Sequence, residues 1–355
     1  MPGEAASLSL PQLSCLLLLV HLSASGGQVW ASVVFDDGTD AIVFALLVVC
    51  LAAVVMAAAA CCRAPERFLS GPRRAWESGH FWHIAALAAN TAVKSVCFAI
   101  GLDYVAALNA AVYIPVIPIA ALLLSRGLGW EGPLLWRQWG GVALAVGGAL
   151  LVTAMRYSGE TDSGEGATKI LVGNLLLLAW VLAAAAAIVL QRPLLRHHAP
   201  DALAAYVLAG AGLLLAASVP WAEVGHAGRW DLSGLAWGAV AYSAAYNALA
   251  GWADALAVTL VAPSVVAMWL VLEPPLTALL AWAACGDTMT GWEYAGSALT
   301  CCGLVLVLYD VEVVAEMVAA EAGEGAAGRE KGAAATKPEP TDSTPLLSPL
   351  REGAI

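Results

Sequence analysis

The sequence predicts an all-α integral membrane protein with about ten transmembrane helices, arranged as two inverted five-helix repeats. The chain of 355 residues is 61% hydrophobic and only 12% charged, which is far more apolar surface than one soluble core could bury. Its second half also repeats the apolar segments of its first half. The formal net charge of -11 argues against a nucleic-acid partner, because phosphate groups would be repelled.

The internal repeat is visible in two pairs of equivalent residues. When the chain is shifted by 157 residues, Asn90 falls on Asn247 and Pro118 falls on Pro275. The sequence Pro-Ile-Ala-Ala-Leu-Leu then faces Pro-Leu-Thr-Ala-Leu-Leu. Both copies consist mainly of apolar segments long enough to span a bilayer, so the duplicated unit is a set of membrane helices.

Glycines extend the repeat further along the chain. A shift of 155 residues places Gly141 and Gly148 on Gly296 and Gly303, which indicates a connection two residues shorter in the second copy. Residues seven apart lie on one face of a helix, and small residues on that face let helices approach closely. We therefore predict a packing role for these four glycines.

Ten apolar segments are predicted to be membrane spans. They place the first repeat over residues 8–155 and the second over residues 170–310. Residues 321–355 are rich in Ala, Gly, Glu, Lys, Thr and Pro, and such a segment cannot bury enough apolar area to order itself, so we expect a disordered cytosolic tail. The predicted spans are Leu8–Phe35, Ala41–Cys62, His80–Gly101, Ala106–Ser125, Gln138–Met155, Ile170–Leu190, Ala202–Pro220, Leu235–Asp254, Val261–Cys285 and Gly291–Asp310.

The first apolar segment has two interpretations. Leu16–Leu22 could be the core of a cleaved signal peptide, although the leading Met-Pro-Gly-Glu lacks the positive charge that such peptides carry. Alternatively, the segment is a first span that is interrupted by small residues at Ser23–Gly27. The next span starts on the outer side in either case, so the downstream topology is unchanged.

Basic residues predict the orientation of the spans. Alternate loops hold eight Lys or Arg residues against three in the remaining loops, and Lys and Arg are retained on the cytoplasmic side. Both termini then face the cytosol. Five spans per repeat is an odd number, so the repeats are inverted, which is the architecture of alternating access. The eight residues are Arg63, Arg67, Arg73, Arg74, Arg126, Arg137, Arg192 and Arg196.

Motifs in both halves carry a family resemblance. They are Gly101–Ala107, Pro115–Leu124 and Arg137–Gly141 in the first half, and Leu272–Pro275, Leu279–Trp282 and Gly286–Asp287 in the second half. With these motifs the chain resembles the drug/metabolite transporter superfamily, in particular its two-repeat, ten-helix EamA-type members. These members include exporters of small metabolites and relatives of nucleotide-sugar carriers. One departure is Ser125–Gly129, which lacks the acidic residue that many relatives carry there. The resemblance implies a transporter but does not identify its substrate.

Two ionisable residues inside spans are the first candidates for function, because such a charge costs about 2.5 to 3.5 kcal/mol on insertion scales. Lys94 lies one turn after Asn90, and its alternative role is to snorkel to the interface. Glu273 lies one turn after Trp269, too deep in the ninth span to snorkel. It acts either as a site or coupling carboxylate, or as a protonated group that satisfies carbonyls freed by Pro274-Pro275. We predict that Lys94 and Glu273 share one central polar cavity.

Other polar side chains extend the candidate substrate-binding or coupling site. Asn90 and Asn247 occupy equivalent positions, so a two-fold axis would bring them near one cavity. Their alternative role is hydrogen bonding between helices. Asn109 and Tyr113 lie one turn apart on the fourth span. The full candidate set is Asn90, Lys94, Asn109, Tyr113, Tyr246, Asn247, Trp269 and Glu273.

Catalytic chemistry has little support in the sequence. The pairs His80 with His83 and His197 with His198 have no carboxylate or cysteine at metal-ligand spacing, so no metal site is predicted. The sequence contains no Walker loop, GxSxG elbow or dinucleotide fingerprint, so no cofactor is predicted and transport would be secondary. An intramembrane enzyme would need a second carboxylate or a histidine facing Glu273, and the sequence indicates none.

The leading hypothesis is a secondary active transporter of a small organic solute. The alternatives are a nucleotide-sugar-type antiporter of the same superfamily and a non-transporting membrane scaffold that kept the fold. The expected partners are a small-molecule substrate and the lipid bilayer, and a homodimer is left open. The tail segment Asp342–Leu347 resembles the acidic dileucine signal that vesicle-coat adaptors read. The expected location is therefore an endomembrane (vacuole, lysosome or Golgi) or the plasma membrane.

Overall fold

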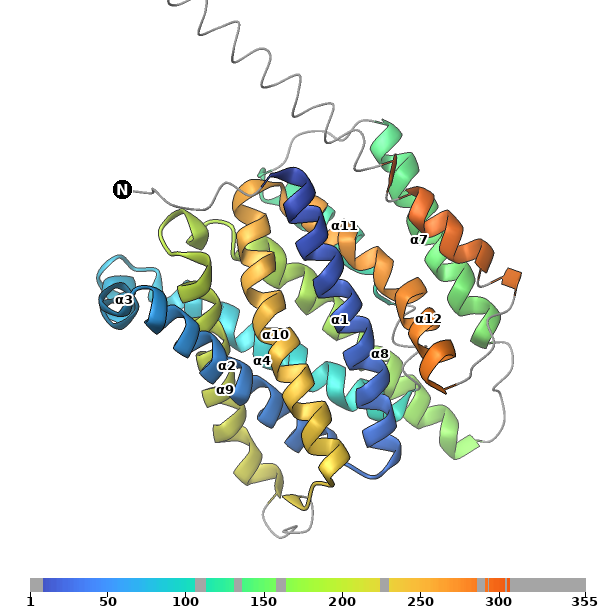
Figure 1. Ribbon diagram of the computed structural model, residues 1–355, viewed down its shortest axis with the longest axis horizontal. Helices are drawn as coiled ribbons and strands as arrows, with labels where there is room; N and C mark the ends of the chain where they lie inside the picture. Colours follow the sequence, from blue (N-terminus) through green and yellow to red (C-terminus); the bar gives the residue numbers. More distant parts are fainter. Residues whose placement is uncertain are drawn as a thin grey trace, which may run out of the picture. The chain divides into compact units, whose positions relative to one another are not determined.

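The computed structural model describes residues 9–105, 113–130, 136–157, 164–223, 230–285, 291–292, 294–303 and 305–306. These residues form helices and connections without a strand, which confirms the all-α class (Figure 1). Asn109, Asp342–Leu347 and the predicted tail lie outside the described residues. The helices are α1 (Leu10–Asp36), α2 (Ala41–Arg63), α3 (Pro65–Glu77), α4 (Phe81–Tyr104), α6 (Val116–Gly127), α7 (Trp136–Tyr157), α8 (Gly164–Leu190), η1 (Leu194–Arg196), α9 (Pro200–Glu223), α10 (Gly234–Leu260), α11 (Pro263–Met268), η3 (Trp269–Leu272) and α12 (Glu273–Cys285).

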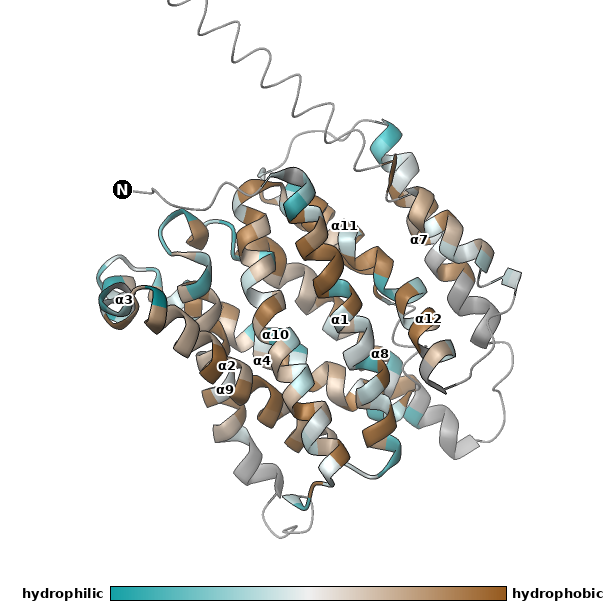
Figure 2. Ribbon diagram, in the orientation of Figure 1, coloured by the Kyte–Doolittle hydropathy of each residue, from teal (hydrophilic) through white to brown (hydrophobic). Residues whose placement is uncertain are grey.

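Six helical segments of the described chain are long and apolar enough to cross a membrane, so the protein is a multi-pass membrane protein. The predicted number of ten spans is not confirmed. Figure 2 shows hydrophobic residues dominating α2 and α9, whereas hydrophilic residues gather at connections and on α3. The six segments are Pro11–Asp36, Ala41–Arg63, Phe81–Tyr104, Leu171–Arg196, Pro200–Ser218 and Pro263–Leu280.

The first apolar segment folds as an uninterrupted helix. α1 continues through the small residues Ser23–Gly27 and packs against α10 and α12. A Cβ atom added to Gly27 would lie 2.8 Å from Cε1 of Tyr246, so a larger residue would have to displace this ring of α10. The small residues that interrupt the apolar pattern of the sequence therefore serve the close approach of two helices, which favours a membrane span over a cleaved signal peptide.

The fourth predicted span is not one regular helix in its described part, which begins at residue 113. The segment Ala106–Ser125 does not continue as one helix, because residues 113–115 form a turn and α6 begins at Val116. A proline disfavours helical backbone at the residue before it, and Pro115 stands directly before α6. The proline that belongs to the family-like motif thus sets the start of this helix.

The ninth predicted span is one run of helix in which the α-helical hydrogen-bond pattern is broken by a 3-10 segment. The segment Val261–Cys285 is divided into α11, η3 and α12. Pro274 and Pro275 have no N–H to donate to the carbonyls one turn earlier, so the α-helical ladder cannot pass through this point. Glu273 is the first residue of α12 and therefore stands directly at the break.

α3 is a helix that the sequence analysis did not predict. Its residues form a polar, basic connection that is too hydrophilic to be a span, but Pro65 occupies the first helical turn, where its missing N–H has no cost. α3 packs against α2 and α4. In Figure 1 it is viewed almost along its axis, whereas α2 runs across the picture, so the two helices are steeply inclined to each other.

The helices of the two repeats pack in a reciprocal pattern. The 157-residue shift makes α1 equivalent to α8, α2 to α9, α4 to α10 and α6 to α12. α1 packs against α10 and α12, and its equivalent α8 packs against α4 and α6. α2 likewise packs against α10, while α9 packs against α4, and α2 and α9 contact each other. Such reciprocity is expected of two halves related by a two-fold axis, and it joins them into one shared core.

The predicted glycine packing is confirmed. α7 and residues 294–303 are the last helices of the two repeats. A Cβ atom on Gly148 would lie 2.5 Å from the carbonyl oxygen of Gly296, and one on Gly303 would lie 2.6 Å from the carbonyl oxygen of Gly141. These two contacts are exchanged by the 155-residue shift. Because a backbone carbonyl cannot move aside as a side chain can, the close approach requires glycine on both helices.

Candidate functional site

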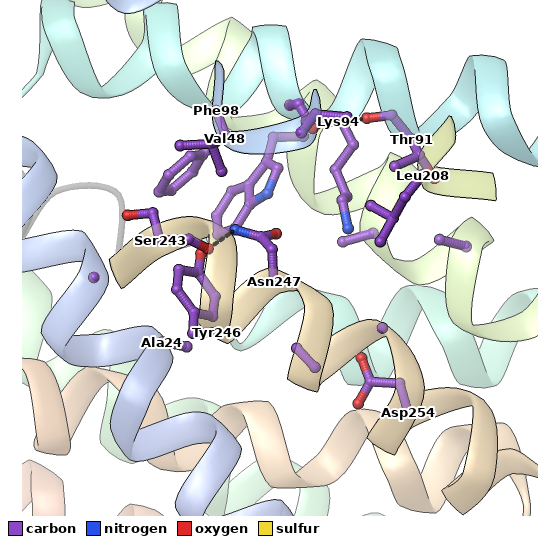
Figure 3. A pocket seen from close by; sticks show the side chains of 18 of the residues that line it. Ala24, Val48, Thr91, Lys94, Phe98, Leu208, Ser243, Tyr246, Asn247 and Asp254 are labelled. Atoms are coloured by element: carbon purple, nitrogen blue, oxygen red, sulfur yellow. Dashed lines mark hydrogen bonds between the residues drawn. The ribbon is translucent and has the colours of Figure 1, made fainter. Parts of the chain in front are cut away.

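A cavity of about 210 Å³ lies where helices of both repeats meet. Helices α1, α2 and α4 of the first repeat and α8, α9 and α10 of the second repeat supply most of its wall. Figure 3 shows Lys94 from α4 and Asp254 from α10 turned into this space, with Asn247 and Tyr246 beside them. The ionisable side chains of the lining, apart from Tyr246, are His21, Lys94, Asp254 and Glu273.

Glu273 is held by two side chains of α1. Oε1 of Glu273 lies 2.9 Å from Nδ1 of His21, and Nε2 of Gln28 donates to Oε2 at 2.9 Å. Ser25 Oγ also donates to the backbone carbonyl of Glu273 at 3.3 Å. His21, Gln28 and Glu273 are almost completely buried, with exposed fractions of 3%, 3% and 4%. We call these three residues the Glu273 network.

Two side chains of α1 explain how a carboxyl group is tolerated at this depth. Pro274 and Pro275 follow Glu273 and have no N–H, so the start of α12 offers the carboxyl group no backbone donor at these two positions. The two carboxyl oxygens of Glu273 each have a hydrogen-bond partner, so a buried acid is not left unsatisfied. Nε2 of His21, in contrast, has no hydrogen-bond partner among the described residues.

A second group of polar residues in the cavity, on α4 and α10, has fewer partners. Lys94 forms no ion pair with any described residue. Oδ1 of Asp254 is buried and has no hydrogen-bond partner in the described part of the chain. Asn247 donates to the carbonyl oxygen of Ser243 in its own helix, at 2.8 Å, and its side chain also bonds to Tyr246. We call Lys94, Asn247 and Asp254 the Lys94 wall.

The structure brings together some of the candidate residues and separates others. Lys94, Tyr246, Asn247 and Glu273 all line the cavity. The side chain of Lys94 therefore points into the protein and does not extend along its helix toward the interface. The remaining described candidates lie outside the lining, and Asn109 is not described.

Asn90, Tyr113 and Trp269 occupy packing positions. Asn90 Nδ2 donates to the carbonyl oxygen of Ala183 at 2.8 Å, which joins α4 to α8. Trp269 is buried in the largest apolar cluster, and Tyr113 packs against the same cluster. For Asn90 this geometry favours the interhelical hydrogen bond that the sequence left as its alternative role.

The sequence analysis missed His21, Gln28 and Asp254. The statement that no histidine or carboxylate faces Glu273 was wrong, because His21 lies 2.9 Å from it. His21 belongs to the segment that has both the signal-peptide and the membrane-span interpretation. Asp254 was placed at the end of the eighth span, but α10 continues to Leu260 and keeps Asp254 inside the helix. A strict search for ionisable residues in every apolar segment would have found both.

These features define a multi-pass helical membrane protein whose two related halves enclose one charged cavity. The model of the EamA-like transporter family matches residues 13–154 and again residues 171–309. The chain belongs to this family, which confirms the resemblance to the drug/metabolite transporter superfamily.

Comparison with solved structures gives the same fold. One crystal structure of a protein superposes with a TM-score of 0.66, over 85% of this chain and 97% of its own, at 15% sequence identity. At this identity the similarity concerns the fold alone. No protein of curated function matches the sequence.

Proposed function

We propose that the protein is a secondary active transporter that moves a small organic solute across a membrane by alternating access between two inverted repeats. The observation that carries the proposal is the cavity, in which charged side chains from both repeats converge. Buried charges in a membrane protein are costly, so they are kept where a substrate or an ion uses them. A scaffold that merely preserved the fold would gain stability from apolar residues at Lys94 and Asp254.

The reciprocal packing of the repeats supports the mechanism. Because α1 and α8 exchange equivalent partners in the opposite repeat, the two halves can exchange conformations without changing the kinds of contact between them. The break before α12 lies next to the cavity and places a site of altered backbone geometry beside Glu273. A change at this break would then move the wall that α1 and α12 share.

Glu273 is the group best placed to couple transport to a proton gradient. It is buried, it lines the cavity, and His21 and Gln28 contact its two oxygens. Protonation of the carboxyl would weaken the hydrogen bond from the N–H of Gln28, because a neutral acid is a poorer acceptor than a carboxylate. The protonation state of Glu273 would thereby act on the packing of α1 against α12.

An uptake screen tests the proposed function. The purified chain is reconstituted into liposomes and exposed to pools of labelled small metabolites, with and without an imposed proton gradient. The control is the variant Lys94→Met/Glu273→Gln, which keeps the cavity but removes two of its charges. We expect at least one polar metabolite to accumulate only with the wild-type chain. If every pool gives equal uptake with both proteins, the non-transporting scaffold becomes the better interpretation.

A further inference from the structure

α3 has one face inside the protein and another face outside it. On the inner face, the ring of Phe68 stacks on that of Tyr206 in α9 with centroids 5.2 Å apart, and Tyr206 Oη donates to the carbonyl of Phe68 at 2.6 Å. Ala75 is buried against α4 and α9. On the outer face, Leu69 is 73% exposed and Trp76 is 63% exposed. Packing within the chain explains the inner face only.

The exposed side chains continue into the start of α4 as one aromatic patch. The ring of Trp76 lies 5.1 Å from that of Phe81 and 6.4 Å from that of Trp82, measured between centroids. Trp82 is 70% exposed. We call Leu69, Trp76, Phe81 and Trp82 the α3 patch. Indole rings combine an apolar body with a polar N–H and are enriched where a membrane meets water.

The connections of α3 place it at the membrane surface. Only Ala64 separates it from α2, and only Ser78–His80 separate it from α4. Both neighbours are membrane spans, so a short helix between them cannot leave the surface of the bilayer. Its steep inclination to α2 in Figure 1 means that α3 runs along this surface and not through it.

The polar side of α3 is basic, although the protein as a whole is acidic. α3 contains three arginines and two glutamates, which gives a net charge of +1 against -11 for the chain. Arg73 and Arg74 are exposed, and Arg73 has an ion pair with Glu77 at 2.8 Å on the same surface. Each basic residue near an anionic leaflet contributes about 1 kcal/mol to membrane attraction.

We propose that α3 is an interfacial helix that binds anionic lipid headgroups of the cytosolic leaflet. The α3 patch enters the boundary between headgroups and acyl chains, while Arg73 and Arg74 contact the lipid phosphates. This surface continues the lipid-facing surface of α2 and α4, which is why the occupant is lipid and not a protein partner. Because Tyr206 fixes α3 to α9, and α9 lines the cavity, the bound lipid steadies one wall of the candidate site.

The depth of α3 can be measured with a fluorophore. In a chain whose native cysteines are replaced by alanine, the probe is attached at Leu69→Cys. Arg74→Cys is the matched control, because exposed Arg74 lies on a different side of the helix from Leu69. The protein is placed in nanodiscs that contain spin-labelled phosphatidylcholine as a quencher. We expect the probe at position 69 to be quenched several-fold more than the probe at position 74. Equal quenching, or a water-exposed probe at position 69, would overturn the proposal and favour a protein partner for the patch.

The preference for anionic lipid is tested without removing cysteines. Thermal unfolding is followed in nanodiscs of phosphatidylcholine alone and of phosphatidylcholine with phosphatidylglycerol. We expect phosphatidylglycerol to raise the melting temperature of the wild type and of the control Arg196→Gln, but not of Arg73→Gln/Arg74→Gln. Loss of the two arginines should weaken anionic lipid binding about 30-fold. A melting temperature that does not depend on the lipid, or a shift that persists in the double variant, would contradict the proposed preference of α3 for anionic lipid.

Discussion

The two sides of the cavity differ in how their charges are satisfied. In the Glu273 network each carboxyl oxygen has a side-chain partner within 2.9 Å, supplied by α1. On the Lys94 wall neither Lys94 nor Oδ1 of Asp254 has such a partner among the described residues. A satisfied network resists change until a proton is added or removed, whereas unsatisfied groups gain most from a solute that brings its own polar groups. We therefore propose that the first side serves coupling and the second serves solute binding.

The largest effect is expected at Glu273. Glu273→Gln keeps the shape of the side chain but cannot bind or release a proton. Accumulation driven by a proton gradient should be abolished, while exchange of labelled for unlabelled solute continues. Both are measured in the same liposomes, and Glu66→Gln, an exposed carboxyl group on α3, is the control. If accumulation survives in Glu273→Gln, the two sides of the cavity do not divide coupling from binding.

Removing the charge of Lys94 should act on solute binding. Lys94→Met should lower uptake and exchange together by about 10- to 100-fold, which corresponds to one charge-assisted hydrogen bond of about 1.5 to 3 kcal/mol. Lys169→Met removes the charge of an exposed lysine and serves as the matched control. Initial rates at several solute concentrations would reveal the change. A variant with wild-type rates would remove Lys94 from the site.

His21 is expected to act by positioning Glu273. His21→Ala leaves Oε1 of Glu273 without its partner and should lower the free energy of unfolding by about 1 to 3 kcal/mol. Asparagine can place an N–H near the position of Nδ1, so His21→Asn should restore both stability and gradient-driven accumulation. Thermal unfolding in detergent and liposome uptake measure the two effects. Restored stability without restored accumulation would instead show that His21 itself carries the proton.

Asn90 should show the smallest effect. Its amide donates to a backbone carbonyl and does not line the cavity, so Asn90→Leu should keep transport and lower the free energy of unfolding by about 0.6 kcal/mol. Parallel measurement of uptake and melting temperature separates the two roles. A loss of uptake with unchanged stability would return Asn90 to the candidate site.

The sequence was informative where the physical constraint is local. Apolar length identifies membrane helices, the repeat identifies Gly148 and Gly303 as contact residues, and the high cost of charge in lipid points to Lys94 and Glu273. The partners of those residues are not local. His21 and Glu273 are separated by 252 positions, and no periodic pattern connects them.

The predicted boundaries of the fourth and ninth spans differ from the structure for a related reason. The turn before Val116 and the break at Glu273 arise from prolines in otherwise apolar segments, and proline is also tolerated inside continuous membrane helices. α3 was missed because its apolar residues are few and its stability comes from contacts with α9. Charge and composition alone describe such a segment as a loop.

The hydrogen bond between α1 and α12 also has a consequence for the biosynthesis of the protein. His21 is synthesised 252 residues before Glu273, and ribosomes add about 5 to 20 residues per second. For roughly 13 to 50 s, α1 is therefore present in the membrane before the imidazole of His21 can bond to the carboxyl group of Glu273. During that interval the unpaired imidazole of His21 is a polar group that an insertion factor or chaperone for unassembled helices can recognise. Glu273 then arrives late in assembly and supplies the partner of His21.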